Sequence, residues 1–190
     1  MSQWPWAKLE RRAVCAERRP YGSGRRIAYA LLTPFWTNEG WVYLAVVIDL
    51  FSRQAIGFSM NERTTAQLAI DALRMAWFRR RPSNGLIFQS DRGVQYASCA
   101  FQKKLSAFGM RGSMSRKGDC WDNAVTETLF GSLKVERLHG MRFETRRQAK
   151  DEVIDWLRFY NSRRLHSTLD YLSPMAFEKK WLGEKGKLVA

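Results

Sequence analysis

The chain is organised around a stretch that opens with QSDRG at positions 89–93 and closes with WDNAVTE at positions 121–127. Asp91 follows the short apolar run LIF at 86–88, so we expect it at the carboxyl end of a buried strand, with Gly93 turning the backbone sharply. Glu127 lies early in a predicted helix, and Gly131 and Lys134 follow it on the same helical face. This pattern indicates a divalent-metal site beside a phosphate contact. The alternative is two solvated acids and a surface lysine.

Composition limits the partners that this chain can have. The 190 residues suffice for one domain with a real core, and 45% of them are hydrophobic, which excludes general disorder. The formal net charge of +14 indicates a polyanionic partner, with nucleic acid first and an anionic membrane surface second. We see no apolar run long enough to span a bilayer and no signal peptide, so we expect a cytoplasmic, DNA-associated protein without a membrane partner. Three scattered cysteines fit reduced structural thiols.

Apolar segments and helix signals predict the order of elements. The segment at 27–35 contains Pro34, which cannot donate to a ladder, so we expect an edge strand or a poorly formed strand there. The branched and aromatic run at 41–48 indicates a central strand. Further strands are expected at 54–60, 86–88 and 110–114, and helices at 65–79, 98–108, around Glu127, at 146–160 and at 175–181. This order predicts an α/β fold of the ribonuclease H-like kind, a mixed five-stranded sheet flanked by helices.

Three segments are expected along the chain. Residues 1–30 are strongly basic and contain the loop signal YGSG at 21–24, which favours a poorly ordered arm or a DNA-contacting tail. Residues 31–182 form the folded core together with the C-terminal helices, and residues 183–190 form a frayed tail.

Several motifs in register resemble one protein family. They are GWVYLAVVIDLFSR at 40–53, SDRGVQY at 90–96, SMSRKG at 113–118, WDNA at 121–124 and YNSRRLH at 160–166. Together with Glu127 and Lys134, they resemble insertion-sequence transposases of the second-reading-frame type, which have a retroviral-integrase-like catalytic core. Thirty-five residues separate Asp91 from Glu127, as in that family. The resemblance runs from about Trp36 to Lys180.

The resemblance implies a DDE mechanism of DNA transposition and integration, in which three carboxylates hold two Mg²⁺ (or Mn²⁺) ions for an in-line attack on a phosphodiester. Asp91 and Glu127 correspond to the second and third carboxylates, and Lys134 to the basic residue placed against the DNA end. The implied partners are element ends, target DNA and further copies of the chain in a homo-oligomer. We expect phosphate contacts from Lys134 and from the basic residues Arg116, Lys117, Arg163 and Arg164.

The first carboxylate of the family is missing. Its position falls at Leu31, where the family reads Asp-Ile-Thr-Tyr and this chain reads LLTP at 31–34. We therefore expect the metal to be held weakly by Asp91 and Glu127 alone and transposition to be impaired. The helix-turn-helix part that precedes the core in the family is not recognisable, so the N-terminal segment is interpreted as a frame-shifted or truncated remnant.

Other functions stay open at this point. The chain could be a non-catalytic nucleic-acid-binding remnant or regulator, or a ribonuclease H-like nuclease that uses Asp49 as its first carboxylate. The simpler interpretation of Asp49 is a strand-end residue that bonds near Ser52 and Arg53.

Overall fold

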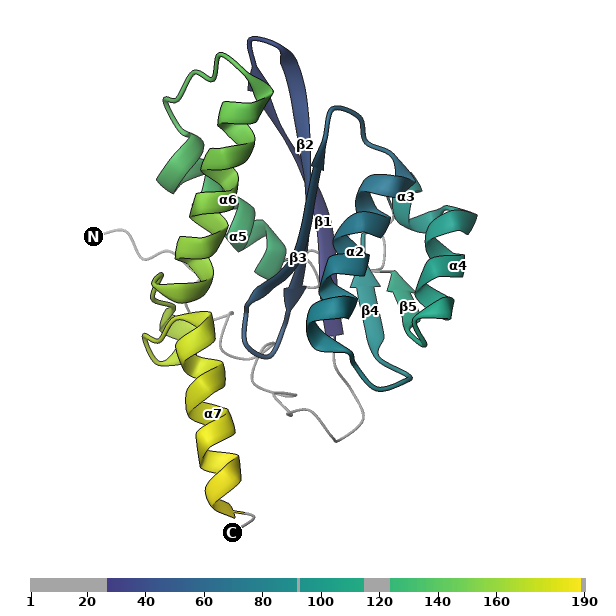
Figure 1. Cartoon of the computed structure of the whole chain (residues 1–190), viewed down its shortest axis with the longest axis vertical. Helices are drawn as coiled ribbons and strands as arrows, with labels where there is room; N and C mark the ends of the chain where they lie inside the picture. Colours follow the sequence, from purple (N-terminus) through teal and green to yellow (C-terminus); the bar gives the residue numbers. More distant parts are fainter. Residues whose placement is uncertain (1–26, 92, 115–123, 189–190) are drawn as a thin grey trace, which may run out of the picture.

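The computed structural model describes residues 27–91, 93–114 and 124–188, and the side chains at 27–31, 124 and 185–188 lie outside that description. Its centre is a five-stranded sheet in the order β3-β2-β1-β4-β5 (Figure 1). The strands are β1 (Ile27–Thr37), β2 (Gly40–Asp49), β3 (Ala55–Asn61), β4 (Ile87–Ser90) and β5 (Arg111–Met114). Strands β1, β2 and β3 pair antiparallel, whereas β1, β4 and β5 pair parallel. The predicted mixed five-stranded sheet is confirmed.

Strand β1 lies in the middle of the sheet, so its expected place at an edge is wrong. The physical reason is the difference in length between its two neighbours. Strand β4 pairs only with Ile27–Ala30, whereas β2 pairs with β1 from Ala28 to Thr37. Pro34 pairs with Tyr43 of β2 in the part of β1 that extends beyond β4, where a missing N–H donor costs no ladder bond on the second side.

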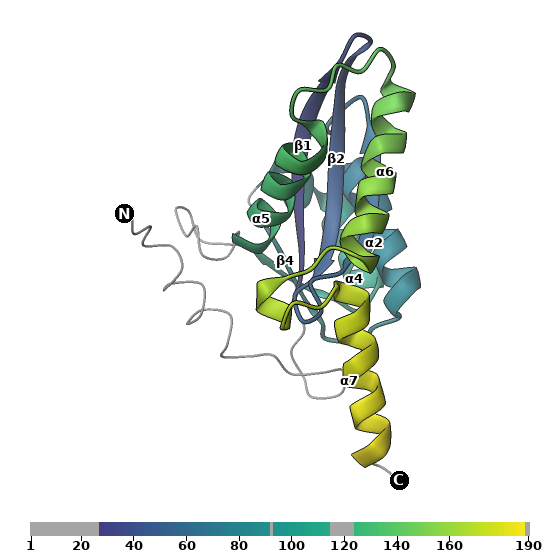
Figure 2. The same ribbon diagram turned by 90° about the vertical axis from the view of Figure 1, so that its left-hand side faces the viewer.

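Helices cover both faces of the sheet (Figures 1 and 2). One face carries α2 (Ala66–Arg80), α3 (Val94–Ala97) and α4 (Cys99–Ala107). The other carries α5 (Ala124–Leu133), which runs into a π-helical turn (Lys134–Leu138), and α6 (Arg146–Ser162). The sequence offers Thr64 or Thr65 as the N-cap of α2 and Thr145 as that of α6. In the structure the hydroxyls of Thr65 and Thr145 accept from the backbone N–H of Leu68 and Gln148, which confirms Thr65 and Thr145 as the caps.

Strand alternation divides the core into two clusters. Val47 of β2 and Phe88 of β4 point to the α2/α4 face and are buried there. Val46 points the other way and is buried with Phe130 of α5 and Trp156 of α6. Burial of one large apolar side chain stabilises the fold by roughly 2 kcal/mol. Turning a strand over would expose several such side chains, so the two clusters fix which residues of each strand face which helices.

Two helices extend further than the sequence predicts. The sequence predicts that the helix which starts at 146 ends at 160, but Asn161 and Ser162 belong to the last turn of α6. The Asn161 amide exchanges hydrogen bonds of 2.9 and 3.0 Å with the backbone of Ala55 in β3. Helix α7 runs over Pro174–Leu188, well past the expected end at Trp181 and into the segment predicted to be frayed. No helix in the described part of the chain is long and apolar enough to cross a membrane.

Candidate active site

Parallel pairing between β1 and β4 brings the first two candidate positions together. Ala30 and Ser90 are the last residues that pair between these strands. Leu31 and Asp91 are the next residues along the two chains, and neighbouring strands lie about 4.8 Å apart. The backbone therefore sets Leu31 beside Asp91, at the carboxyl end of β4.

Strand alternation assigns both positions to the sheet face that α5 covers. Position 31 pairs with Val46, which is buried in the α5/α6 cluster. Phe88 is buried in the α2/α4 cluster, so position 91, an odd number of residues further on, belongs to the opposite face. Because Glu127 lies on α5 itself, the three positions predicted for a DDE site all belong to one face of the sheet.

A local turn holds the carboxylate of Asp91. Its Oδ1 accepts a hydrogen bond of 2.9 Å from the backbone N–H of Gly93. A Cβ atom at position 93 would lie 2.9 Å from that same oxygen and 3.0 Å from Oε1 of Gln95, which is too close for either to stay in place. Gly93 has an ordinary φ of −56°, so a side chain at this position would have to displace only the ends of the Asp91 and Gln95 side chains. With glycine there, the half-buried carboxylate of Asp91 is held by this turn at the end of the strand.

Glu127 and Gly131 lie on the exposed side of helix α5, and Lys134, which follows the helix, is exposed as well. The opposite side of the helix is buried through Leu129 and Leu133. A Cβ atom added at Gly131 would meet nothing within 4 Å, so this stretch of the helix surface is bare, as the sequence predicts. The α-helix ends at Leu133, and Lys134 opens the π-helical turn instead of continuing the same helix.

Acidic side chains form no metal-binding cluster around Asp91 and Glu127 in the part of the chain that the structure describes. No group of three or more His, Cys, Asp or Glu residues there could hold a metal ion. The metal-ligand roles of Asp91 and Glu127 stay a prediction.

Asp49 lies elsewhere. It pairs with Ala28, three residues from Leu31 along β1, which corresponds to about 10 Å. Alternation also puts it on the α2/α4 face with Val47, away from α5. A role for Asp49 as a substitute first ligand therefore lacks support from the geometry.

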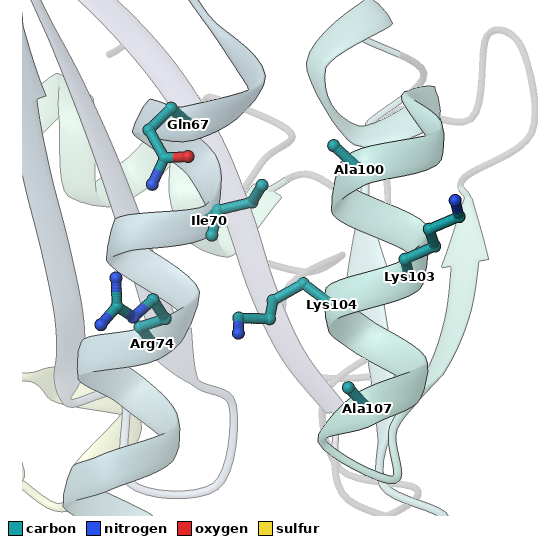
Figure 3. A pocket seen from close by; sticks show the side chains of 7 residues that line it. All are labelled: Gln67, Ile70, Arg74, Ala100, Lys103, Lys104 and Ala107. Carbon is teal, nitrogen blue, oxygen red and sulfur yellow. The ribbon is translucent and has the colours of Figure 1, made fainter.

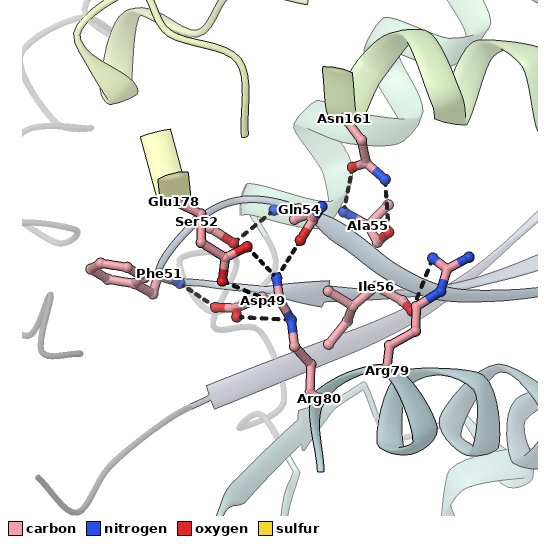
Figure 4. Close-up of polar contacts among 10 residues, drawn as sticks. All are labelled: Asp49, Phe51, Ser52, Gln54, Ala55, Ile56, Arg79, Arg80, Asn161 and Glu178. Atoms are coloured by element: carbon pink, nitrogen blue, oxygen red, sulfur yellow. Dashed lines mark hydrogen bonds and ion pairs between the residues drawn. The ribbon is translucent and has the colours of Figure 1, made fainter. Parts of the chain in front are cut away.

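The carboxylate of Asp49 is part of a structural network (Figure 4). It accepts a 2.9 Å hydrogen bond from the backbone N–H of Phe51 and lies 3.8 Å from Nε of Arg80. The same guanidinium binds Glu178 of α7 at 2.7 and 2.9 Å and contacts Gln54. The strand-end interpretation of Asp49 is confirmed, and its network also ties α7 to the end of β2.

Comparisons with known proteins bear on the same residues. Two family profiles, both described as integrase core domain, match residues 31–120 and 127–182. Transposase InsF of insertion sequence IS3A from Escherichia coli K12 is 50% identical over 163 residues, 84% of this chain and 56% of that protein. The transposase of insertion sequence element IS904 from Lactococcus lactis is 44% identical over 144 residues, 75% of this chain and 57% of that protein.

The chain belongs to the integrase-core family of insertion-sequence transposases. It spans just over half the length of these curated relatives. The family match begins at residue 31, before the limit near Trp36 that the motifs indicate, and thus includes the position where the first carboxylate of the family is expected.

The integrase-core fold is also seen in solved structures. The HTLV-2 integrase catalytic core domain, solved in complex with magnesium in a dimeric form, superimposes with a TM-score of 0.57 at 15% identity. The match covers 80% of this chain and 94% of that one. At this identity the likeness shows the fold alone, and it confirms the predicted ribonuclease H-like class.

The basic residues predicted to contact DNA divide into three groups in this integrase core. Arg116 and Lys117 lie outside the described residues. Lys134 and Arg163 are exposed. Arg164 is instead engaged within the protein, because its guanidinium donates to both carboxylate oxygens of Glu136, at 2.7 to 3.1 Å, and to the Ser132 hydroxyl at 2.9 Å.

This pair organises a polar cluster where the π-helical turn meets the end of α6. Burial alone would raise the pKa of Glu136, but the hydrogen bonds and charge of Arg164 and the Trp156 N–H outweigh it, so its pKa is lowered. Burial also lowers the pKa of His166 to about 4, helped by the charges of Arg164 and Arg53. Sequence analysis missed this cluster because no local spacing links position 136 to positions 164 and 166.

Proposed function

We propose that this chain is the catalytic core of a DDE-type transposase in which the first metal ligand is replaced at Leu31, so that phosphodiester transfer is impaired. The register between β1 and β4 carries the proposal, since it sets Leu31 beside Asp91 on the face of α5. The strand is complete and in register with β2 from position 28 to position 37, so the fold supports a carboxylate at position 31. What the chain lacks is the carboxylate itself.

The donor set fits one divalent ion better than two. Mg²⁺ takes hard oxygen ligands and is often bound by one or two carboxylates with several waters, a requirement that Asp91 and Glu127 can meet. Mn²⁺ accepts the same ligands. A two-metal site needs a further carboxylate to bridge the ions, and Leu31 supplies none. A metal bound here would supply charge neutralisation at the scissile phosphodiester.

DNA is the partner that this surface suits. The net charge of +14 favours a polyanion, and exposed Lys134 follows the bare helix surface at Gly131, where a polymer backbone could approach closely. We propose that the chain contacts element ends and target DNA through Lys134, Arg163, Arg116 and Lys117. Association of several copies, as in the dimeric form solved for the HTLV-2 core, is part of the same proposal.

The proposal is tested by restoring the carboxylate. Purified wild-type, Leu31→Asp and Leu31→Asn chains are incubated with supercoiled plasmid DNA and either MgCl₂ or MnCl₂, and nicked product is measured over time. We expect Leu31→Asp to nick at a rate about 100-fold or more above the wild type, because a preorganised electrostatic group contributes on the order of 3 kcal/mol to the transition state. Leu31→Asn is the matched control, as it has nearly the same shape without the charge.

A second arm covers the possibility that the neighbouring residues disturb the new ligand. Replacing residues 31–35 with Asp-Ile-Thr-Tyr-Ile removes Pro34 as well and should nick at least as fast as Leu31→Asp. Robust metal-dependent nicking by the unmodified chain, abolished by Asp49→Ala, would contradict the proposal and make Asp49 a ligand.

A non-catalytic DNA-binding protein is the second candidate, favoured by the aliphatic residue at the ligand position together with the high positive charge. It predicts that the plasmid is bound but that neither carboxylate-restoring variant nicks it. The same experiment therefore separates the two functions.

A further inference from the structure

An open groove of about 420 Å³ runs between α2 and α4, on the sheet face opposite α5 (Figure 3). Gln67, Ile70 and Arg74 of α2 line one side, and Ala100, Lys103, Lys104 and Ala107 of α4 line the other. The lining therefore contains three cations and no acid. None of these cations belongs to the motifs that resemble the transposase family.

The three cations are available to a ligand. Arg74 has an ion pair with Asp71 at 3.8 Å, but both side chains are about half exposed, so the pair is screened and weak. Lys103 and Lys104 have no ion-pair partner in the part of the chain that the structure describes. Lys104 rests beside the ring of Phe108, 5.1 Å from its centroid, and reaches into the groove towards α2 (Figure 3).

The groove begins at the end of the sheet where β3 and β4 finish, which is also where Asp91 lies. Helix α2 follows the carboxyl end of β3 and α4 follows that of β4, and these two strands run in the same direction. Both helices therefore start at this end of the sheet and run away from it side by side. The side chain of Gln95 donates to the carbonyl of Thr64, which joins the start of α3 to the start of α2. The positive ends of the two helix dipoles add to the potential there.

We propose that this groove holds the sugar–phosphate backbone of a DNA strand that continues beyond the end of the sheet where Asp91 lies, with Arg74, Lys103 and Lys104 each neutralising a phosphate. The proposal rests on the proposed function, because it extends the path of the same DNA over the second face of the core. Lys134 and Arg163 lie on elements of the α5/α6 side, so the groove is a separate contact surface.

DNA fits the groove better than an acidic protein segment does. An amphipathic segment needs apolar pockets for its anchor side chains. The apolar residues in the lining are Ile70, Ala100 and Ala107, and two alanines and one isoleucine form no pockets for large anchor side chains. A phosphate backbone needs only cations at suitable spacing, and its binding is independent of sequence.

The test compares two triple variants that lose the same charge. The groove variant carries Arg74→Ala, Lys103→Ala and Lys104→Ala. The control carries Arg147→Ala, Lys179→Ala and Lys180→Ala, which removes three exposed cations from α6 and α7. Affinity for a fluorescein-labelled 30-base-pair duplex of arbitrary sequence, and for the corresponding single strand, is measured by anisotropy between 50 and 300 mM KCl.

We expect the groove variant to bind about tenfold or more weaker than the wild type at 100 mM KCl. Its slope of log affinity against log salt should be flatter by about two to three units on the duplex, since each neutralised phosphate contributes roughly 0.9. The control should stay close to the wild type in both quantities. Equal losses in the two variants would reduce the effect to net charge and overturn the proposal.

A single substitution guards against a folding artefact. Ala100→Glu places a carboxylate in the groove in the first turn of α4, where a negative charge favours the helix, so the fold should be preserved. Like the groove triple variant, Ala100→Glu should weaken DNA binding. Unchanged DNA binding by Ala100→Glu and by the groove triple variant would overturn the proposal. If these variants instead lose binding to a labelled poly-glutamate peptide, an acidic protein segment is the occupant.

This outcome can be separated from that of the catalytic proposal, because binding requires no chemistry. Failure of Leu31→Asp to nick DNA, combined with a flattened salt slope in the groove variant, leaves a DNA-binding groove on an inactive core. Nicking by Leu31→Asp together with an unaffected groove variant refutes the groove alone.

Discussion

Asp91 and Asp49 both follow the end of a buried strand, yet the structure uses them differently. Asp49 is 6% exposed, lies 3.8 Å from Arg80 and accepts from the backbone of Phe51. Asp91 is half-buried, accepts from Gly93 and has no cationic partner among the described residues. The carboxylate of Asp49 is neutralised by the protein and holds the fold together, whereas the described surroundings of Asp91 are those that we expect of the proposed metal ligand.

The register between strands makes the same distinction. Asp91 lies beside position 31 on the α5 face, and Asp49 lies about 10 Å further along β1 on the other face. Position at a strand end is thus insufficient to identify a ligand. The neighbouring strand and the face of the sheet decide which carboxylates can meet.

The largest expected effect tests the different roles of Asp91 and Asp49 directly. In the Leu31→Asp chain, Asp91→Asn should lower nicking about 100-fold or more with little loss of stability, because it removes an electrostatic group at the reacting centre. Asp49→Asn in the same chain should retain nicking and lower the melting temperature. Plasmid nicking and thermal unfolding, measured on both variants, check the two halves of this prediction. The opposite pattern would exchange the roles of the two residues.

The next effect sharpens the structural role of Asp49. Arg80→Met should lower the free energy of unfolding by about 3 kcal/mol or more, because it leaves the carboxylates of Asp49 and Glu178 without their cation in a poorly solvated site. Glu178→Gln keeps the arginine and should cost about 1 kcal/mol. Urea unfolding followed by tryptophan fluorescence gives both values. Equal losses in the two variants would show that Arg80 serves only to anchor α7.

The sequence predicts most of the fold because the strands and helices have strong local signals. The apolar run at 41–48 and the caps Thr65 and Thr145 correctly locate β2, α2 and α6. The misplaced strand is β1, because Pro34 suggests an edge and only the unequal lengths of β2 and β4 show that a proline fits in a central strand. That information is tertiary and has no local signature.

The candidate site also has features that local sequence predicts and features that depend on tertiary contacts. Asp91 at a strand end, Glu127 on a helix and the bare surface at Gly131 follow from local pattern. The pairing of Arg164 with Glu136 does not, since it joins residues on two elements. Arg164 was therefore predicted to be a DNA contact although the protein itself occupies its guanidinium.

A smaller effect concerns pH. The pKa of His166 is lowered to about 4, first by burial and then by Arg164 and Arg53, partly offset by Glu136. Between about pH 4 and the ordinary histidine pKa near 6.5, the unfolded chain binds more protons than the folded one, so stability rises with pH through this window and levels off above it. The imidazole is partly exposed, so we expect a total change of about 1 kcal/mol.

His166→Gln should flatten this part of the stability profile, whereas His139→Gln, at an exposed site, should leave it as in the wild type. Urea unfolding at intervals between pH 4.5 and 7.5 measures the profile. The lowered pKa of Glu136 acts in the same direction at lower pH, as its contribution is lost when pH falls through its folded pKa. A slope that survives in His166→Gln throughout the window would assign the pH dependence to another group.

The smallest expected effect comes from the same comparison made between two cations, one exposed and one paired within the protein. Lys134 is exposed beside the bare surface at Gly131, whereas the side chain of Arg164 is 23% exposed and is paired with Glu136. If Lys134 neutralises one phosphate, Lys134→Ala should flatten the slope of log affinity against log salt by about one unit, alike on all duplex sequences. Arg164→Ala should leave that slope unchanged and lower stability by about 1 kcal/mol, because its charge is already used within the protein. Anisotropy titrations from 50 to 300 mM KCl and urea unfolding of both variants give the comparison.

An unchanged slope for Lys134→Ala would show that Lys134 makes no phosphate contact. A slope flattened equally by Arg164→Ala would mean that its guanidinium leaves Glu136 when DNA binds, and an intramolecular partner would then be a poor guide to which cations stay available to DNA.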